Sequence, residues 1–286
     1  MPDSPPPVWV LLRGLLRESG HWGAFVRTLQ ETLPPGSLIL TPDLPGNGAR
    51  WHERSPAHVA EMVQAVRADL AARGLDRPCH VLAMSLGAMV AVEWARQHPQ
   101  ELVRCVLINT SLRPYSPFWQ RLRPRQYRRI ARLIVSGTAL EWEDGIMRMT
   151  TQHPGPRQAL MAAWLSLRSS HPVSRLNGLR QLWAAARYRA DAPPSMPLLL
   201  LNSAGDELVN PRCSEHLATA WGAPLTTHPT AGHDLPLDDG PWVAQQVARW
   251  LASAADQAQG GASAASLAAT LSCTEDERAT SGTAVP

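Results

Sequence analysis

The stretch that decides the fold runs from His80 to Val90 and reads HVLAMSLGAMV. A short apolar run ends in Ser85, and an alanine-rich helical pattern follows at once. This order is typical of a nucleophile elbow, a sharp strand-to-helix turn that lifts a serine hydroxyl clear of a sheet. Because the turn is crowded, the residues two before and two after the serine must be small. Ala83 and Gly87 meet this requirement in the pattern A-x-S-x-G. The stretch therefore predicts Ser85 as a nucleophile.

Ser85 has a second interpretation, because serine is also a favoured N-terminal cap of ordinary helices. The two interpretations differ in what they demand of the rest of the chain. A nucleophile needs a base, an acid and oxyanion donors in suitable loops, whereas a cap needs none of these.

Composition and length limit the class of protein. The chain has 286 residues, which fits one large domain or a domain with an insertion, and all 27 basic residues are arginine. The four cysteines show no C-x-x-C pair and no zinc-like spacing, so we expect no metal site. The N-terminus lacks a signal-peptide pattern, and no apolar run reaches the roughly 18 residues that span a bilayer. We expect a cytoplasmic protein without a membrane span.

Strand-like apolar runs alternate with helical patterns along most of the chain. The expected strands are Val8–Leu12, Ser37–Thr41, Cys79–Met84, Cys105–Asn109, Pro197–Asn202 and Pro224–His228. The expected helices are Gly20–Thr32, Pro56–Arg73, Leu86–Gln97, Pro211–Trp221 and Pro241–Ala255. Ser55 and Pro56 suit the N-cap and first helical position of the second helix. Such alternation predicts an α/β protein with a mostly parallel sheet and helices on both faces.

The alternation stops between residues 112 and 191, where the pattern is helical throughout. This segment holds 14 arginines against four acidic residues and carries a charge of +10, whereas the whole chain carries +3. We interpret it as a helical cap inserted into a core of residues 8–111 and 192–255. Residues 256–286 are mostly small and polar, which predicts a disordered tail.

Two later loops supply the partners that a nucleophilic serine needs. Asp206 follows the strand at Pro197–Asn202, and His233 follows the next strand, so both are expected at the carboxyl edge of the sheet, where ligands bind. A histidine takes the proton of the serine, and a carboxylate orients the histidine. Asp206 could instead be a turn former, and His233 an ordinary loop histidine. Asp234 and Asp238 are competing acids, and His233 with Asp238 also fits an H-x-x-x-x-D acyltransferase pattern.

The oxyanion of an acyl-transfer reaction needs two backbone N–H donors. Leu86 follows the serine directly and is the first expected donor. The loop after the first strand contains Gly14, which permits a close approach, and Leu15 is the second expected donor.

Taken together, these motifs resemble the α/β-hydrolase superfamily, in particular its capped serine esterases, which include carboxylesterases and carrier-protein methyl ester esterases. The order Ser, Asp, His along the chain matches that superfamily. The resemblance extends from about Val8 to Leu251 and is carried by Arg13–Leu15 with His21 and Trp22, Asp43–Gly48, Ala83–Gly87, Gly205, Asp206 and Val209, and Gly232 with His233.

The resemblance implies a triad of Ser85, Asp206 and His233 that works without metal or organic cofactor. The chain departs from the family at Arg13 and Asn47, where histidines are usual. An acid sometimes follows the strand at Val106–Ile108 in this family, but Asn109 and Thr110 stand there, which favours Asp206. Only seven residues precede Val8, so we expect about six strands instead of eight.

The cap is expected to shape the substrate pocket. Four tryptophans at 119, 142, 164 and 183 either hold the cap together or line the pocket. The arginines form either a solvated face or a surface for an anionic substrate or an acidic carrier protein. Nucleic acid is not expected, because no binding motif accompanies the charge.

Three functions compete at this point. The first is hydrolysis of a carboxylic ester or thioester that has an apolar part, through an acyl-enzyme. The second uses the same triad on an anionic metabolite, as a C–C hydrolase, lyase or carrier-protein esterase. The third is a non-catalytic binding module on the same scaffold.

Overall fold

The computed structural model describes residues 5–253, so the expected tail at 256–286 lies outside the described residues. Its centre is a six-stranded sheet in the order β2-β1-β3-β4-β5-β6, and every neighbouring pair is parallel. The strands are β1 (Val8–Leu12), β2 (Leu38–Leu40), β3 (Cys79–Met84), β4 (Leu102–Ile108), β5 (Leu198–Ser203) and β6 (Leu225–His228). The α/β class and the six strands expected from the sequence are confirmed.

The inner strands are apolar at almost every position because helices cover both faces of the sheet. All five residues of β1 and all six of β5 are buried. The edge strand β2 is only three residues long and leaves Leu38 half exposed. Side chains alternate between the two faces along each strand.

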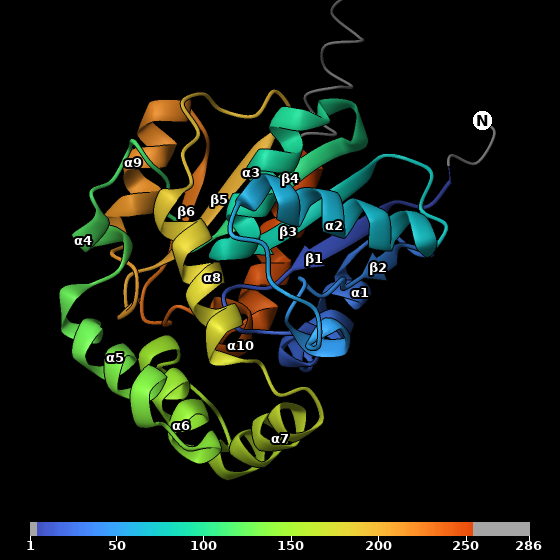
Figure 1. Cartoon of the computed structure of the whole chain (residues 1–286). Coiled ribbons are helices and arrows are strands. Elements are labelled where there is room, and N and C mark those ends of the chain that lie inside the picture. Colours follow the sequence, from blue (N-terminus) through green and yellow to red (C-terminus); the bar gives the residue numbers. More distant parts are fainter. Residues whose placement is uncertain (1–4, 254–286) are drawn as a thin grey trace, which may run out of the picture. The chain divides into compact units, whose positions relative to one another are not determined.

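Helices α2 (Val59–Ala72), α3 (Leu86–Gln97) and α9 (Arg212–Trp221) contribute to one core cluster with every second residue of β1 and β3 and with apolar residues of β4 and β5. Helix α1 (Phe25–Thr32) lies on the opposite side of the sheet from α2 and α3 (Figure 1). The short helices are η1 (Ser19–Trp22), η2 (Gly48–Arg50), η3 (Pro99–Glu101) and α10 (Leu235–Asp238).

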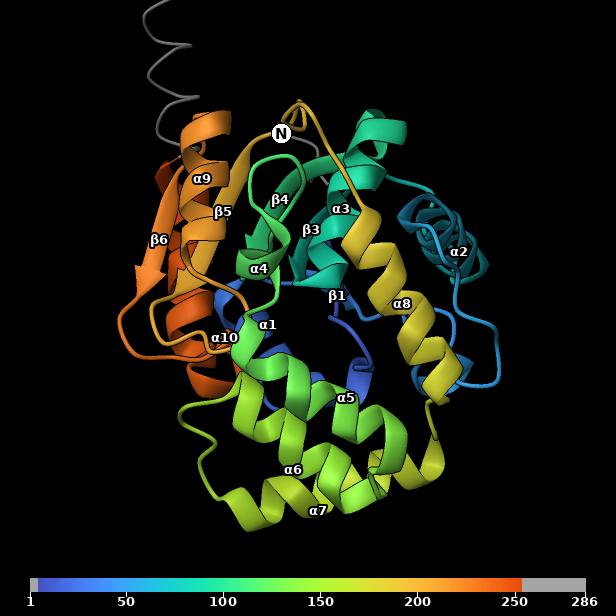
Figure 2. The same ribbon diagram turned by 60° about the vertical axis from the view of Figure 1, so that its left-hand side comes forward.

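Between β4 and β5 the named elements of the described chain are all helices. They are α4 (Phe118–Arg121), η4 (Pro124–Gln126), α5 (Tyr127–Ser136), α6 (Ala139–Thr150), α7 (Arg157–Ser170) and α8 (Arg175–Arg187). Helices α5, α6 and α7 lie side by side, and α8 leads back beside α3 (Figure 2). Leu133, Trp142 and Trp164 belong to a separate apolar cluster within this layer. The division into a core and a cap at residues 112–191 stays a prediction.

Two expected helices differ from the structure. The helix expected from Pro56 begins at Val59 with His58 as N-cap, so the prediction of Ser55 as the cap was wrong. The Ser55 hydroxyl instead donates to the carbonyl oxygen of Pro45 at 2.7 Å, a tertiary bond that local sequence does not reveal. The helix expected at Gly20–Thr32 is divided into η1 and α1 at Gly23, whose φ of +52° breaks the helix.

The last described segment, residues 240–253, is helical, as expected for the region after Pro241. None of the helices within residues 5–253 combines the length and the apolar character that a membrane span requires.

Candidate active site

Ser85 stands at a strained turn between β3 and α3. Its φ of +54° and ψ of −118° lie in a region that residues other than glycine rarely adopt. Its backbone N–H donates to the carbonyl oxygen of Ile108 at 3.0 Å, which holds the turn against β4. A Cβ atom at Gly87 would lie 2.4 Å from the carbonyl oxygen of Leu12, so only glycine fits two residues after the serine. The A-x-S-x-G pattern thus forms the predicted strand-to-helix turn.

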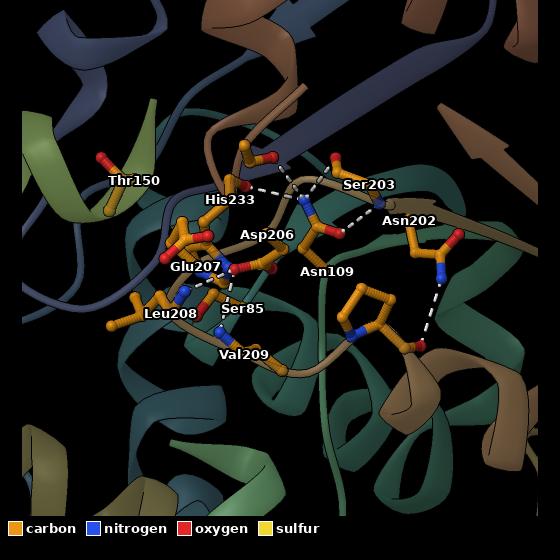
Figure 3. Close-up of polar contacts among 12 residues, drawn as sticks. Ser85, Asn109, Thr150, Asn202, Ser203, Asp206, Glu207, Leu208, Val209 and His233 are labelled. Carbon is orange, nitrogen blue, oxygen red and sulfur yellow. Dashed lines mark hydrogen bonds and ion pairs between the residues drawn. The ribbon is translucent and has the colours of Figure 1, made fainter. Parts of the chain in front are cut away.

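His233 and Asp206 form a buried pair at the carboxyl edge of the sheet. His233 Nδ1 lies 2.7 Å from Asp206 Oδ2, and the two side chains are only 4% and 1% exposed. The other carboxylate oxygen of Asp206 accepts backbone N–H bonds from Leu208 at 2.8 Å and Val209 at 2.9 Å (Figure 3). These bonds fix the carboxylate in the position in which it contacts the imidazole.

Ser85 and His233 line the same cavity, and Figure 3 shows them close to Asp206. Among the described residues, no hydrogen bond joins the Ser85 hydroxyl to His233. Bonds between nucleophile and base are often long in unliganded enzymes and tighten when substrate binds. The catalytic roles of Ser85, Asp206 and His233 therefore stay predictions that this geometry permits.

The two competing acids are engaged elsewhere. Asp234 accepts two hydrogen bonds from the Arg13 guanidinium, at 3.0 and 2.6 Å, in a buried ion pair. Asp238 accepts bonds from the backbone N–H groups of Gly232, Gln152 and His153 at 2.7 to 3.1 Å. Both acids therefore hold the histidine loop in place, and Asp206 is the carboxylate that contacts the imidazole.

Asn109 is a further residue that positions His233. Its amide nitrogen donates to the carbonyl oxygen of His233 at 2.8 Å and to the Ser203 hydroxyl at 3.1 Å (Figure 3). Its amide oxygen accepts the backbone N–H of Ser203 at 3.0 Å. The sequence indicated only that Asn109 is not an acid. Its φ of +46°, which asparagine tolerates, was not visible from the sequence.

The loop that contains the expected oxyanion donor Leu15 is held by polar side chains. The N–H of Leu16 donates to the side-chain oxygen of Gln181 at 3.0 Å, and Gln181 donates to Asn47 at 2.8 Å. Asn47 in turn donates to the carbonyl oxygen of Arg17 at 3.1 Å. Gln181 comes from α8, so part of the loop conformation is set by the helices between β4 and β5.

Leu15 and Leu86 both line the cavity with Ser85. Gly14 brings the loop close to the serine, since a Cβ atom there would lie 3.1 Å from the Ser85 Cβ. Leu86 is the first residue of α3, where backbone N–H groups have no partner within the helix. The two N–H groups as oxyanion donors stay a prediction.

A buried ion pair connects the same loop to the cap. Arg17 donates to Glu143 of α6 at 2.6 Å, and its guanidinium lies 3.9 Å from the centre of the Trp164 ring. Arg168 of α7 lies 3.3 Å from the same carboxylate. Burial lowers the pKa of Arg17, and burial together with the nearby Arg17 and Arg13 charges holds the pKa of His21 well below its usual value. No sequence pattern indicated this network.

The cavity above Ser85 has a volume of about 160 Å³ and a mainly apolar wall. The apolar side chains come from core and cap alike and are Leu15, Leu16, Met84, Leu86, Met89, Leu122, Ile130, Leu133, Ile134, Trp142, Ile146, Met149, Leu182, Ala185, Leu208 and Val209. Trp142 lines it and Trp164 is buried in the cap cluster, whereas Trp119 and Trp183 are more than half exposed. No group of three or more His, Cys, Asp or Glu side chains in the described residues is arranged to hold a metal ion.

Two curated relatives share part of this sequence. The pimeloyl-[acyl-carrier protein] methyl ester esterase of Aromatoleum aromaticum is 30% identical over 234 residues, which cover 74% of this chain and 85% of that protein. The protein of the same name from Chromobacterium violaceum is 38% identical over 93 residues, about a third of each chain (32% and 34%).

A solved structure described as a thermophilic esterase from Thermogutta terrifontis superposes with a TM-score of 0.68 at 20% identity, over 88% of this chain and 91% of that one. At 20% sequence identity, this similarity shows a shared fold and nothing about function. The model of the alpha/beta hydrolase family matches residues 9–246, which include the candidate site and all of the sheet except Val8. The chain therefore belongs to the alpha/beta hydrolase family.

Proposed function

We propose that this alpha/beta hydrolase cleaves carboxylic esters or thioesters through an acyl-enzyme on Ser85. The observation that carries the proposal is the buried pair of His233 and Asp206, whose side chains lie 2.7 Å apart. His233 lines the same cavity as Ser85. In the proposed reaction, His233 takes the proton of the Ser85 hydroxyl while its oxygen attacks the ester carbonyl. Asp206 fixes the imidazole tautomer and stabilises the imidazolium.

The tetrahedral oxyanion would accept hydrogen bonds from the N–H groups of Leu15 and Leu86. His233 then protonates the leaving alcohol or thiol, and water attacks the acyl-enzyme with His233 again as base. This sequence of steps uses neither metal nor organic cofactor. The apolar wall of the cavity supports a substrate with an apolar acyl or alcohol part.

Activity-based labelling tests the proposal most directly. A fluorophosphonate probe should modify the wild-type protein, and mass mapping should place the label on Ser85. Ser111 is a matched control, because it is also buried and lines the same cavity. The Ser85→Ala variant should lose both the label and the hydrolysis of p-nitrophenyl butyrate, whereas Ser111→Ala should retain the label. Equal inertness of wild type and Ser85→Ala would favour a non-catalytic binding module.

A second candidate is an esterase for acyl groups bound to an acidic carrier protein. Two observations favour it: the named relatives, and seven arginines between residues 113 and 132 of the cap. An ester carried by an acyl carrier protein should then be hydrolysed with a higher kcat/KM than its free counterpart. Arg128→Glu, on the exposed side of α5, should reduce turnover of the carrier-bound ester far more than that of p-nitrophenyl butyrate. Equal effects on both substrates would argue against a carrier protein at this surface.

The same triad could also act on an anionic metabolite, as in a C–C hydrolase or lyase. A substrate panel that includes carboxylate-bearing ketones and lactones separates this reaction from ester hydrolysis. A cytoplasmic location stays a prediction, tested by cell fractionation.

A further inference from the structure

A second pocket shares one side chain with the catalytic cavity. It has a volume of about 420 Å³ and is lined by Arg113, Arg121 and Arg189, together with prolines, Ser116, Phe118 and Ala186. No acidic side chain is among the described residues that line it. Arg121 belongs to the wall of both the pocket and the cavity above Ser85. Three positive charges thus meet at a pocket that adjoins the candidate active site.

The backbone fixes the spacing of two of these arginines, which are far apart in the sequence. Arg113 follows β4, and Arg189 follows α8. An isolated parallel bridge joins the two residues, and the N–H of Ala190 donates to the carbonyl oxygen of Arg113 at 3.0 Å. The two side chains therefore start from fixed positions, which lowers the entropy lost when they bind a common ligand.

Arg121 contributes a charge that no carboxylate within residues 5–253 offsets through a salt bridge. Its two terminal nitrogens donate to the carbonyl oxygens of Ala185 at 2.6 Å and Ala186 at 3.1 Å, in the last turn of α8. These neutral partners explain why the side chain is held in place. Its Nε atom is buried without a partner in the described chain. Burial lowers the pKa of Arg121 to about 10, and the nearby Arg113 charge acts in the same direction.

The other two arginines remain available to a ligand. Arg113 is exposed, and Arg189 pairs with Asp191 at 2.6 Å while both side chains are more than half exposed. Exposed ion pairs of this kind contribute little free energy, so a ligand can replace Asp191 at modest cost. An anion in the pocket would reduce the repulsion between Arg113 and Arg121 and accept charge-assisted hydrogen bonds.

We propose that the pocket of Arg113, Arg121 and Arg189 binds an anionic oxygen group, a phosphate or a carboxylate, on the part of an ester substrate that extends beyond the catalytic cavity. The identification of the ligand as a substrate rests on the proposed function, whereas the binding site itself does not. Arg121 lies between the two sites. It would therefore contact the substrate between its anionic end and its reacting ester.

Direct binding tests the site without any need for catalysis. Octyl phosphate, octanoate and octanol share one apolar chain, and calorimetric titration gives the Kd of each. Wild type should bind at least one of the two anions about tenfold more tightly than octanol. The double variant Arg113→Gln/Arg189→Gln should lose that preference. This variant leaves the Arg121 bonds to α8 intact, so it tests the pocket and not the stability of the helix.

Arg148→Gln is the matched control, because Arg148 is also an exposed cap arginine in a salt bridge with an acidic neighbour, Asp144, and it lines neither cavity. Its anion preference should equal that of wild type. Equal binding of octanol and both anions by wild type would overturn the proposal. The proposal would also be overturned if Arg148→Gln lost the preference for anions as fully as the double variant does. Anion binding would then depend on the overall positive charge of this region and not on the pocket.

A kinetic arm separates this proposal from the proposed function. Two esters of equal length are compared, one with a terminal carboxylate and one without. The double variant should raise KM for the charged ester about tenfold. KM for the neutral ester and kcat for both esters should change less than twofold. Absence of hydrolysis of either ester, with anion binding intact, would refute the esterase and leave the binding site standing.

Discussion

Removal of the Glu143 carboxylate should destabilise this protein far more than removal of the carboxylate next to it. Glu143 is 3% exposed and holds Arg17, which is 6% exposed, at 2.6 Å. In Glu143→Leu the Arg17 guanidinium stays buried, and Arg168, which also faces this carboxylate, adds repulsion. Loss of one partner of a buried pair costs about 3–5 kcal/mol, because the remaining charge is uncompensated.

That cost corresponds to a fall in Tm of about 6–20 °C for a chain of this size. Asp144 provides the matched control, since it neighbours Glu143 on α6 and bonds two arginines, but is 34% exposed. Asp144→Leu should cost about 1 kcal/mol or less, because exposed pairs are screened by water. Urea unfolding followed by tryptophan fluorescence gives both free energies.

The double variant Arg17→Met/Glu143→Leu distinguishes an unpaired charge from simple loss of packing. If the unpaired charge is the cause, removal of Arg17 should restore a large part of the stability lost in Glu143→Leu. The reasoning is refuted if Glu143→Leu and Asp144→Leu destabilise equally, or if the double variant is less stable than Glu143→Leu.

Three further outcomes follow from the structure. Asp206→Asn should lower kcat for p-nitrophenyl butyrate by about 10³- to 10⁴-fold with a nearly unchanged KM, because the imidazole loses its orienting charge; a loss below tenfold would contradict this role. Gly87→Ala should cost about 1–3 kcal/mol in urea unfolding, since its Cβ would lie 2.4 Å from the Leu12 carbonyl oxygen; wild-type stability would show that the turn can relax. His21 has a depressed pKa in the folded state, so it contributes stability above its unfolded pKa of about 6.5 that is lost as the pH falls below that value. His21→Gln should therefore flatten the decline in Tm between pH 6.5 and 4.5, and an equally steep decline in both proteins would refute this account.

The parts of the fold that sequence predicted are those with a local cause. Buried parallel strands are continuous apolar runs, so β1, β3 and β5 could be placed to within a residue or two. The order of Ser85, Asp206 and His233 could be read because Ser85 directly follows β3 and the other two lie in the loops after β5 and β6. The strained turn at Ser85 has a signature of small residues, since backbone atoms of β1 leave no room at Gly87.

The unpredicted parts are polar contacts between residues distant in the chain. Arg17 and Glu143 are 126 positions apart, and nothing near either residue shows that they pair. Ser55 resembled a helix cap because its local surroundings suit one, but its hydroxyl bonds Pro45 and Gln181 instead. Tertiary bonds of buried hydroxyls and amides outweigh local capping preference here, since an unpaired buried polar group costs more than a lost cap.

These same contacts link the predicted cap to the proposed chemistry. Leu15, the proposed oxyanion donor, is followed by Leu16 and Arg17, and the cap holds both through Gln181 and Glu143. The φ of +61° at Leu16 shows that this segment is not in a relaxed conformation, so the bonds from the cap are needed to maintain it. A change in the predicted cap that widens the cavity should therefore also move the backbone N–H of Leu15, the proposed donor. Because one set of helices shapes the pocket and holds the oxyanion loop, substrate preference and kcat should change together in cap variants of this protein.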